Sequence, residues 1–270
     1  MAVAGEEQGL FGSTHYAELA RQQGWNIAGM ITNDIVGSSL GQNGFRDPNT
    51  VRLFAEGPPA NETPEEAVVR RTTGSENDSP ARQLARYAKS VAETTATDMR
   101  VRIIYRRDRY LRGGDHIPFL ERRFPAARFT EVNEDYRHQH QDVRVEDGVQ
   151  FGDLTDFVDF DYTTRVARVN GATLAGLASA PAAPSGVVVH TGQLSVDTAL
   201  EWDANVEPDL AGYEIVYRET VQPYWTHTIK VGNVTSHTVK GITKDNFLFG
   251  VRAIDSDGNR SPVTFPQPVE

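Results

Sequence analysis

The stretch Gly5-Glu6-Glu7-Gln8-Gly9-Leu10-Phe11-Gly12-Ser13 follows a short apolar run at residues 1–4 and places two adjacent carboxylates between glycines. This pattern predicts a point where a buried strand gives way to a helix. Two carboxylates near a core are costly to hold unless a cation compensates their charge. Because such a turn directs the two side chains apart, one can bind a metal while the other accepts a proton from metal-bound water. Taken alone, a Glu-Glu pair is also consistent with a solvated turn.

Composition sets the broad class of the protein. The 270 residues, 39% hydrophobic and 9% aromatic, predict packed globular structure in one large domain or two ordinary ones. The 37 acidic and 27 basic residues give a net charge of -10, which argues against nucleic-acid or anionic-membrane partners. This charge mildly favours metals or cationic ligands, although solubility explains it equally. With no cysteine, any zinc must be bound by His, Asp and Glu.

The sequence contains neither a candidate transmembrane helix nor a recognisable targeting signal. No apolar run approaches the roughly 20 residues that a transmembrane helix requires. The first residues, two acids after a four-residue apolar run, do not form a signal peptide. We therefore expect a soluble chain whose localisation the sequence leaves unknown.

Helix and strand patterns alternate through the N-terminal two thirds. Residues 14–23 predict a helix that ends at Gly24, and residues 25–32 a buried strand, which together indicate a parallel α/β sheet. Asp34 follows that strand, at the sheet edge where ligands bind in such folds. An Asp in this position is also a common helix cap or Asx turn. Further elements are predicted as a short edge strand at 51–54, a helix at 81–93, a strand at 101–105 and a helix at 154–169 with Phe157, Phe160 and Val166 in the core.

In the last third of the chain, the spacing of apolar residues changes to the alternation that is typical of strands. Residues 176–185 are small, aperiodic and proline-bearing, which predicts a linker between domains at 1–175 and 186–270. Short alternating strands follow at 195–202, 212–218, 226–231, 237–239 and 246–255, as in an all-β sandwich.

The residues around the two glutamates form a long and specific motif. The run Gly5 to Ser13 resembles the signature of the M28 family of zinc aminopeptidases. This resemblance implies that Glu6 is the general base and Glu7 a zinc ligand, and that Asp34, at its strand end, is another ligand. It implies an α/β fold with flanking helices, one or two zinc ions, and a peptide substrate.

Two later segments extend the resemblance. Residues 113–119, GGDHIPF, resemble a family phrase that places Asp115 and His116 beside the site, where a carboxylate orients a ligand. Capping of the following helix by Asp115 is the alternative. In residues 131–142 the family's last zinc ligand is a histidine a few residues before an Asp. His138, with Asp142 four residues on, is slightly favoured over His140.

The tail resembles a fibronectin type III module. Trp202 matches the core tryptophan, residues 212–218 the third strand, and Phe249-x-Val251-x-Ala253 the end of the module. Phe247 and Phe249 stand where a tyrosine-corner hydroxyl is expected. Such modules are usually spacers or adhesive domains, and the tail carries no catalytic pattern.

The chain also departs from the family. An earlier His and a metal-bridging Asp precede the Glu-Glu motif in the family, whereas only four residues precede Gly5 here. We therefore expect an N-terminally truncated sheet. Glu7, Asp34 and one late histidine suffice for one zinc with an open position, but not for a two-metal site. The exposed sheet edge favours homo-oligomer formation.

The resemblance implies a zinc-dependent aminopeptidase that releases N-terminal residues from peptides, impaired by the missing ligands. In an intact relative, zinc activates water, Glu6 takes its proton and returns it to the leaving amine. One alternative is a catalytically inactive remnant that acts as a scaffold or binds a partner through the fibronectin module. Another is a single-metal hydrolase with a different substrate. The fold and the fibronectin tail suit a secreted or periplasmic parent.

Overall fold

A four-stranded mixed sheet is the centre of the N-terminal part of the molecule. The computed structural model describes residues 2–94 and 97–270, so Met1 lies outside the described residues. The strand order is β1-β4-β2-β3. The β1–β4 and β2–β3 pairs are parallel and the β2–β4 pair is antiparallel. The strands are β1 (Met30–Asn33), β2 (Thr50–Ala55), β3 (Arg100–Ile104) and β4 (Ala126–Glu131).

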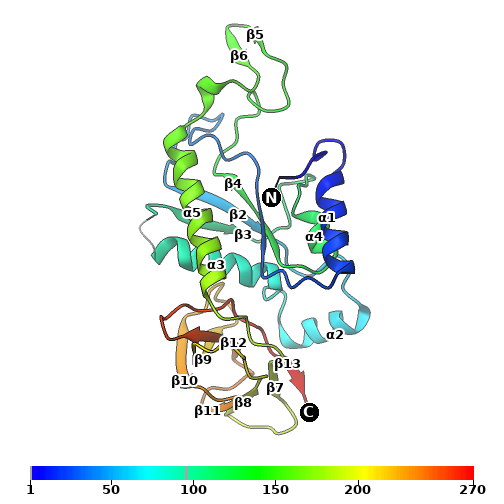
Figure 1. Cartoon of the computed structure of the whole chain (residues 1–270), viewed down its shortest axis with the longest axis vertical. Helices are drawn as coiled ribbons and strands as arrows, with labels where there is room; N and C mark the ends of the chain where they lie inside the picture. Colours follow the sequence, from blue (N-terminus) through cyan, green and yellow to red (C-terminus); the bar gives the residue numbers. More distant parts are fainter. Residues whose placement is uncertain (1, 95–96) are drawn as a thin grey trace.

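Helices cover both sides of this sheet (Figure 1). They are α3 (Pro80–Thr94) and α5 (Phe160–Ser179), which pack in one core cluster, and α1 (Phe11–Gln22) and α4 (Ile117–Glu121), which pack in another. The helix α2 (Pro64–Thr73) lies apart from the sheet (Figure 1). Leu84 of α3 and Val166 of α5 pack against Leu53 and Phe129 of the sheet in one core cluster. A second cluster joins α1 and α4 around Ala126, and includes Ala17, Ala20, Phe119 and Leu120. The predicted α/β core with flanking helices is therefore present.

Several sequence expectations need correction. Residues 2–4 form no strand, because the carbonyl of Ala4 accepts the backbone N–H of Gly12 and the segment folds against α1. The strand at residues 50–55 is not an edge strand, since β4 and β3 flank it and five of its six residues are buried. Phe160 is not core: it begins α5 with 67% of its surface exposed. The same helix continues to Ser179, four residues into the expected linker.

The helix α2 was not predicted, although its sequence carries a start signal. Thr63 accepts the backbone N–H of Glu66, and Glu66 accepts that of Thr63, which forms a complete capping box. Pro64 occupies the first turn, where a missing N–H costs nothing. None of the α2 residues is buried, so the helix has no apolar stripe from which it could be recognised.

The C-terminal part consists of two sheets packed face to face. The three-stranded sheet has the order β10-β9-β12, and the four-stranded sheet has the order β11-β8-β7-β13. The buried Trp202 lies between the sheets with Ile215, Phe249 and Val251, as the predicted core tryptophan should. The strands are β7 (Val188–His190), β8 (Thr198–Glu201), β9 (Leu210–Glu219), β10 (His227–Gly232), β11 (Ser236–Val239), β12 (Phe247–Asp255) and β13 (Gln267–Val269).

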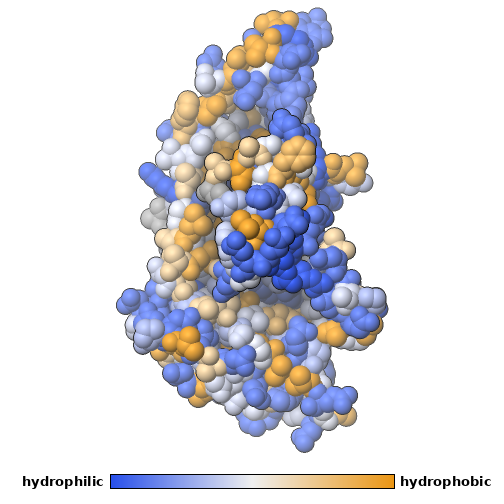
Figure 2. Space-filling model, turned by 45° about the vertical axis from the view of Figure 1, so that its right-hand side comes forward, coloured by the Kyte–Doolittle hydropathy of each residue, from blue (hydrophilic) through white to orange (hydrophobic). Residues whose placement is uncertain are grey.

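The remaining elements lie between β4 and α5. The hairpin of β5 (Arg144–Glu146) and β6 (Val149–Phe151) turns at Asp147-Gly148, and a short 3-10 helix follows at Thr155–Phe157. No helix in the described part of the chain is long and apolar enough to cross a bilayer. On the face shown in Figure 2, apolar residues occur as scattered groups among hydrophilic ones.

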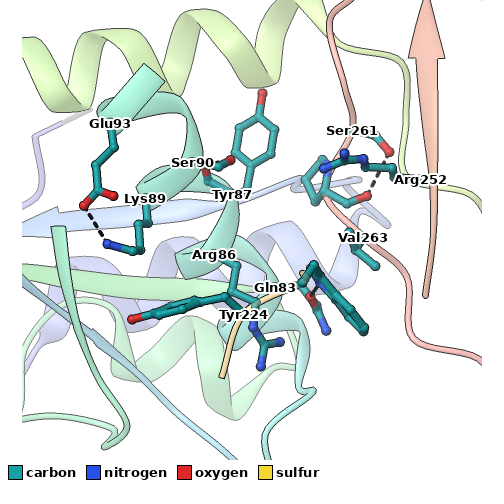
Figure 3. A pocket seen from close by; sticks show the side chains of 12 residues that line it. Gln83, Arg86, Tyr87, Lys89, Ser90, Glu93, Tyr224, Arg252, Ser261 and Val263 are labelled. Atoms are coloured by element: carbon teal, nitrogen blue, oxygen red, sulfur yellow. Dashed lines mark hydrogen bonds and ion pairs between the residues drawn. The ribbon is translucent and has the colours of Figure 1, made fainter. Parts of the chain in front are cut away.

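The sandwich packs directly on α3. The buried carboxylate of Asp78 contacts Arg218 of β9 at 2.6 Å and Arg86 of α3 at 3.1 Å. The indole N–H of Trp225 donates to the side chain of Gln83 at 3.1 Å. A small cavity of about 180 Å³ remains in this interface, lined by α3 on one side and by Tyr224, Trp225 and Val263 on the other (Figure 3).

Candidate active site

The turn that carries Glu6 and Glu7 leads directly into α1. Gly5 and Gly9 adopt φ angles of +77° and +119°, which a residue with a side chain rarely adopts. The carbonyl of Glu6 accepts the backbone N–H groups of Gly9 and Leu10 and closes the turn. The glycines therefore fix a backbone that displays both acids before the helix, with 67% of the Glu7 side chain exposed.

Four carboxylates share the space around this turn. Burial raises the pKa of Glu6 above its ordinary value, and the nearby charges of Asp34, Glu7 and Asp115 raise the pKa further. The Arg128 guanidinium acts in the opposite direction, but more weakly. An excess of negative charge is therefore gathered at one place, which favours binding of a cation.

Of the two candidate histidines, His140 lies beside Glu7. Its Nδ1 is 3.9 Å from Glu7 Oε2, and its backbone has a φ of +52°. The ring of His138 instead stacks on Phe157, with 3.5 Å between ring centroids, and its Nδ1 is 3.6 Å from Asp135 Oδ2. The ring of His138, the favoured candidate, therefore packs on Phe157, and it is His140 that lies beside Glu7.

The predicted orienting residues differ in their surroundings. Asp115 makes no side-chain hydrogen bond to α4, whose N-cap is His116, so the capping alternative is wrong. One carboxylate oxygen of Asp115 is buried without a hydrogen-bond partner among the described residues. His116 is fully buried, and burial lowers the pKa of its ring below the ordinary value. Its Nε2 donates to the carbonyl of Arg107 at 2.9 Å. Asp142 is exposed.

Asp34 follows β1, as predicted, but its carboxylate is in an ion pair. Its Oδ2 is 2.8 Å from Arg128 and 4.0 Å from Arg109. Burial raises the pKa of Asp34, and the two arginines partly offset this effect. No helix cap or Asx turn made by the Asp34 side chain is found among residues 2–94 and 97–270.

These residues do not complete a zinc site in the observed arrangement. In the described ranges, no group of three or more His, Asp or Glu side chains is placed to bind one metal ion. Glu7 and His140 are near each other, whereas Asp34 is held by Arg128. Three protein ligands are the usual minimum for a catalytic zinc.

Three residues around Asp34 were missed by sequence reasoning: Asp108, Arg109 and Arg128. The pattern of β4 gave a weak signal. Arg128 and Thr130 alternate with Ala127 and Phe129, so they share the face of the sheet opposite the main core. An arginine inside a fully buried strand requires acidic partners, but the sequence does not reveal that these lie in the loop after β3 and at the end of β1.

Comparison with known proteins gives consistent matches. Residues 1–146 match the family described as Peptidase family M28. A "Probable zinc metalloprotease" of Pyrenophora teres f. teres is 49% identical over 269 residues, which are 99% of this chain and 56% of that protein. A protein of the same description from Pyricularia oryzae is 50% identical, over 99% of this chain and 54% of its own length. The chain thus spans about half the length of these relatives.

Among solved structures, the Legionella pneumophila LapA aminopeptidase is similar over 63% of this chain and 37% of its own length. The identity is 18% and the TM-score 0.39. The family match covers more than half of the 270 residues and includes the turn of Glu6 and Glu7. This chain belongs to peptidase family M28.

Proposed function

We propose that this chain carries part of the active site of a zinc-dependent peptidase that releases N-terminal residues from peptides. The observation that carries the proposal is the turn of Glu6 and Glu7, with Asp34 and Asp115 as charged neighbours and His140 beside Glu7. Membership of family M28 and the zinc in the names of the relatives support the metal. The choice of N-terminal residues rests on the resemblance of the Glu-Glu motif.

The acids have distinct roles in this proposal. Glu6 accepts a proton, because partial burial and neighbouring acids make its carboxylate more basic than an ordinary glutamate. Glu7 and His140 are metal donors. The same negative surroundings attract the protonated amino terminus of a peptide.

We assign residues 1–175 to the peptidase part and residues 186–270 to a fibronectin type III domain, supported by the two packed sheets and the buried Trp202. In the described sheet β1 pairs only with β4, so its other edge is available to a second copy. We further propose that the parent protein is exported, as the combination of a peptidase part with a fibronectin type III tail suggests.

The test compares matched peptides and matched variants. We expect zinc-reconstituted protein to cleave a peptide with a free amino terminus and to leave its N-acetylated form intact. Glu6→Gln should lower kcat/KM by about 10²- to 10⁴-fold, the usual contribution of a general base, with unchanged zinc content. The control is Glu65→Gln, an exposed residue of α2. Equal cleavage of the acetylated peptide would rule out an aminopeptidase.

An inactive scaffold is the second candidate, because the described residues lack a complete set of three metal donors. In that case the protein neither retains zinc nor cleaves either peptide, and its function lies in binding. Such binding would involve the whole molecule, since the sandwich packs on α3 through buried charges.

A further inference from the structure

One exposed turn of the C-terminal sandwich carries an acceptor sequence for N-linked glycosylation. Residues Asn233-Val234-Thr235 match the pattern Asn-x-Ser/Thr, in which the hydroxyl group two residues on is required for attachment of a glycan to the asparagine. All three residues are exposed. They connect β10 to β11 in a short turn, which begins after Gly232 with its φ of +75°. The acceptor therefore lies on a surface loop, which is where a bulky, hydrated group can be attached.

This turn lies at the periphery of the sandwich. Among the described strands, β10 is the outer strand of the three-stranded sheet and β11 is the outer strand of the four-stranded sheet. The register of β10 with β9 places Gly232 opposite Tyr213. Arg218 of β9, which contacts Asp78, is five residues further along the strand, a distance of about 17 Å. A glycan on Asn233 would therefore begin away from the contact between the sandwich and α3.

Three other sequences of the same pattern, which begin at Asn61, Asn77 and Asn259, differ in their surroundings. In two of them the acceptor nitrogen is engaged in a hydrogen bond. Asn61 Nδ2 donates to the carbonyl of Glu121 at 2.9 Å. Asn259 Nδ2 donates to Asp255 Oδ2 at 2.8 Å. Because a glycan is attached to this same nitrogen, it would crowd the bonded partner at either position.

The third of these sequences lies where the sandwich contacts the peptidase part. Asn77 is half-buried, and its Oδ1 accepts a hydrogen bond from Arg82. It directly precedes Asp78, whose buried carboxylate contacts Arg218, so a bulky group on Asn77 would disturb this contact. In addition, a proline follows each of the three sequences and restricts the hydroxyl-bearing residue to extended conformations: Pro64, Pro80 and Pro262. Thr235 is followed by a serine and is free of this restriction.

We propose that Asn233 is the principal acceptor of an N-linked glycan on this chain. In the transfer, Asn233 Nδ2 bonds to the anomeric carbon of an oligosaccharide that is linked through a diphosphate to a polyprenol lipid. The bond from that carbon to the phosphate oxygen breaks, the lipid diphosphate leaves, and the amide nitrogen loses one proton. This inference rests on the proposed export of the parent protein, because the transfer takes place in the secretory pathway, and not on its peptidase activity.

The test is expression of the full chain behind a secretory signal in eukaryotic cells, followed by enzymatic removal of N-linked glycans and peptide mass spectrometry. We expect one glycan on the unmodified protein, with the side chain of Asn233 converted to a carboxylate when the glycan is removed. Asn233→Gln and Thr235→Ala should both abolish the glycan, whereas Thr235→Ser should keep it, because it retains the hydroxyl group. The matched control is Asn61→Gln, at another exposed acceptor sequence, which should leave the glycan in place.

Two results would overturn this proposal. One is a glycan that persists in Asn233→Gln and maps to another asparagine. The other is an unmodified protein without a glycan, from cells in which a control glycoprotein carries one. Protein that is retained in the cells decides equally, since the transfer precedes secretion. A glycan on Asn233 of a protein that binds no zinc would refute the proposed peptidase function alone.

Discussion

At the scale of single residues, the chain path decides which histidine reaches the site. The spacing to Asp142 favoured His138, but spacing does not show that Phe157 takes up the His138 ring. His140 reaches Glu7 through a backbone with positive φ, which histidine adopts uncommonly. The sequence therefore identified the segment, while the contact of His138 with Phe157 leaves His140 as the histidine that lies beside Glu7.

We predict that His140→Ala weakens zinc binding at least tenfold, because it removes a donor next to Glu7. His138→Ala should leave zinc affinity within about threefold and lower the free energy of unfolding by about 1 kcal/mol, as expected for loss of an aromatic stack. Chelator competition and urea denaturation measure the two effects. A stronger zinc defect in His138→Ala would return the ligand role to that residue.

A second residue-scale prediction concerns Glu131, at the end of β4. Burial raises its pKa to about 8, with smaller contributions from Glu134 and Asp135, while the backbone N–H of Ser38 and Arg52 act against the shift. The folded protein thus keeps a proton that the unfolded chain releases near pH 4.5. Stability from this group is complete below pH 4.5 and is lost as the pH rises toward 8, by up to about 1.4 kcal/mol per unit.

Glu131→Gln should remove this pH dependence, because the amide stays neutral and keeps an acceptor for Ser38. Urea denaturation between pH 5 and 8 measures the slope of unfolding free energy against pH for both proteins. Equal slopes for Glu131→Gln and the unmodified protein would mean that Glu131 is ionised in the folded protein. The matched control is Glu146→Gln, an exposed position of β5.

At the scale of elements, strong local patterns were predicted well and context-dependent ones were not. The helix α3 and the strand β3 follow clear periodicity, and the Gly-bounded turn before α1 follows from its glycines. The central position of β2 did not follow, because pairing partners are set by tertiary contacts. The contact of the sandwich with α3 was likewise hidden, since Asp78 and Arg218 lie 140 residues apart.

Because of that contact, we predict that the two parts of the molecule unfold together. Asp78→Asn leaves Arg86 and Arg218 buried without their shared carboxylate, which should cost about 3–5 kcal/mol. Lys240→Met breaks the exposed pair with Asp197 and should cost at most about 1 kcal/mol. Urea denaturation followed by tryptophan fluorescence measures both. Separate transitions in the unmodified protein would contradict the coupling.

At the scale of the whole molecule, the sequence predicts the acidic residues of the candidate site but not the ion pairs that hold them. Glu6, Glu7 and Asp34 follow from motif and strand-end position, and the structure gathers their charges in one region. The arginines that hold the acids could not be predicted, because their partners come from separate loops. The family match accounts for residues 1–146, and the relatives are about twice as long.

The most direct test of the account is the zinc content of the chelator-stripped and reconstituted protein, measured beside Glu7→Ala and the exposed control Glu65→Ala. The proposed zinc site, with Glu7 as one of its donors, predicts about one zinc per chain. This zinc should be lost in Glu7→Ala and kept in the control. Absence of bound zinc in the unmodified protein, or its full retention in Glu7→Ala, would contradict the account.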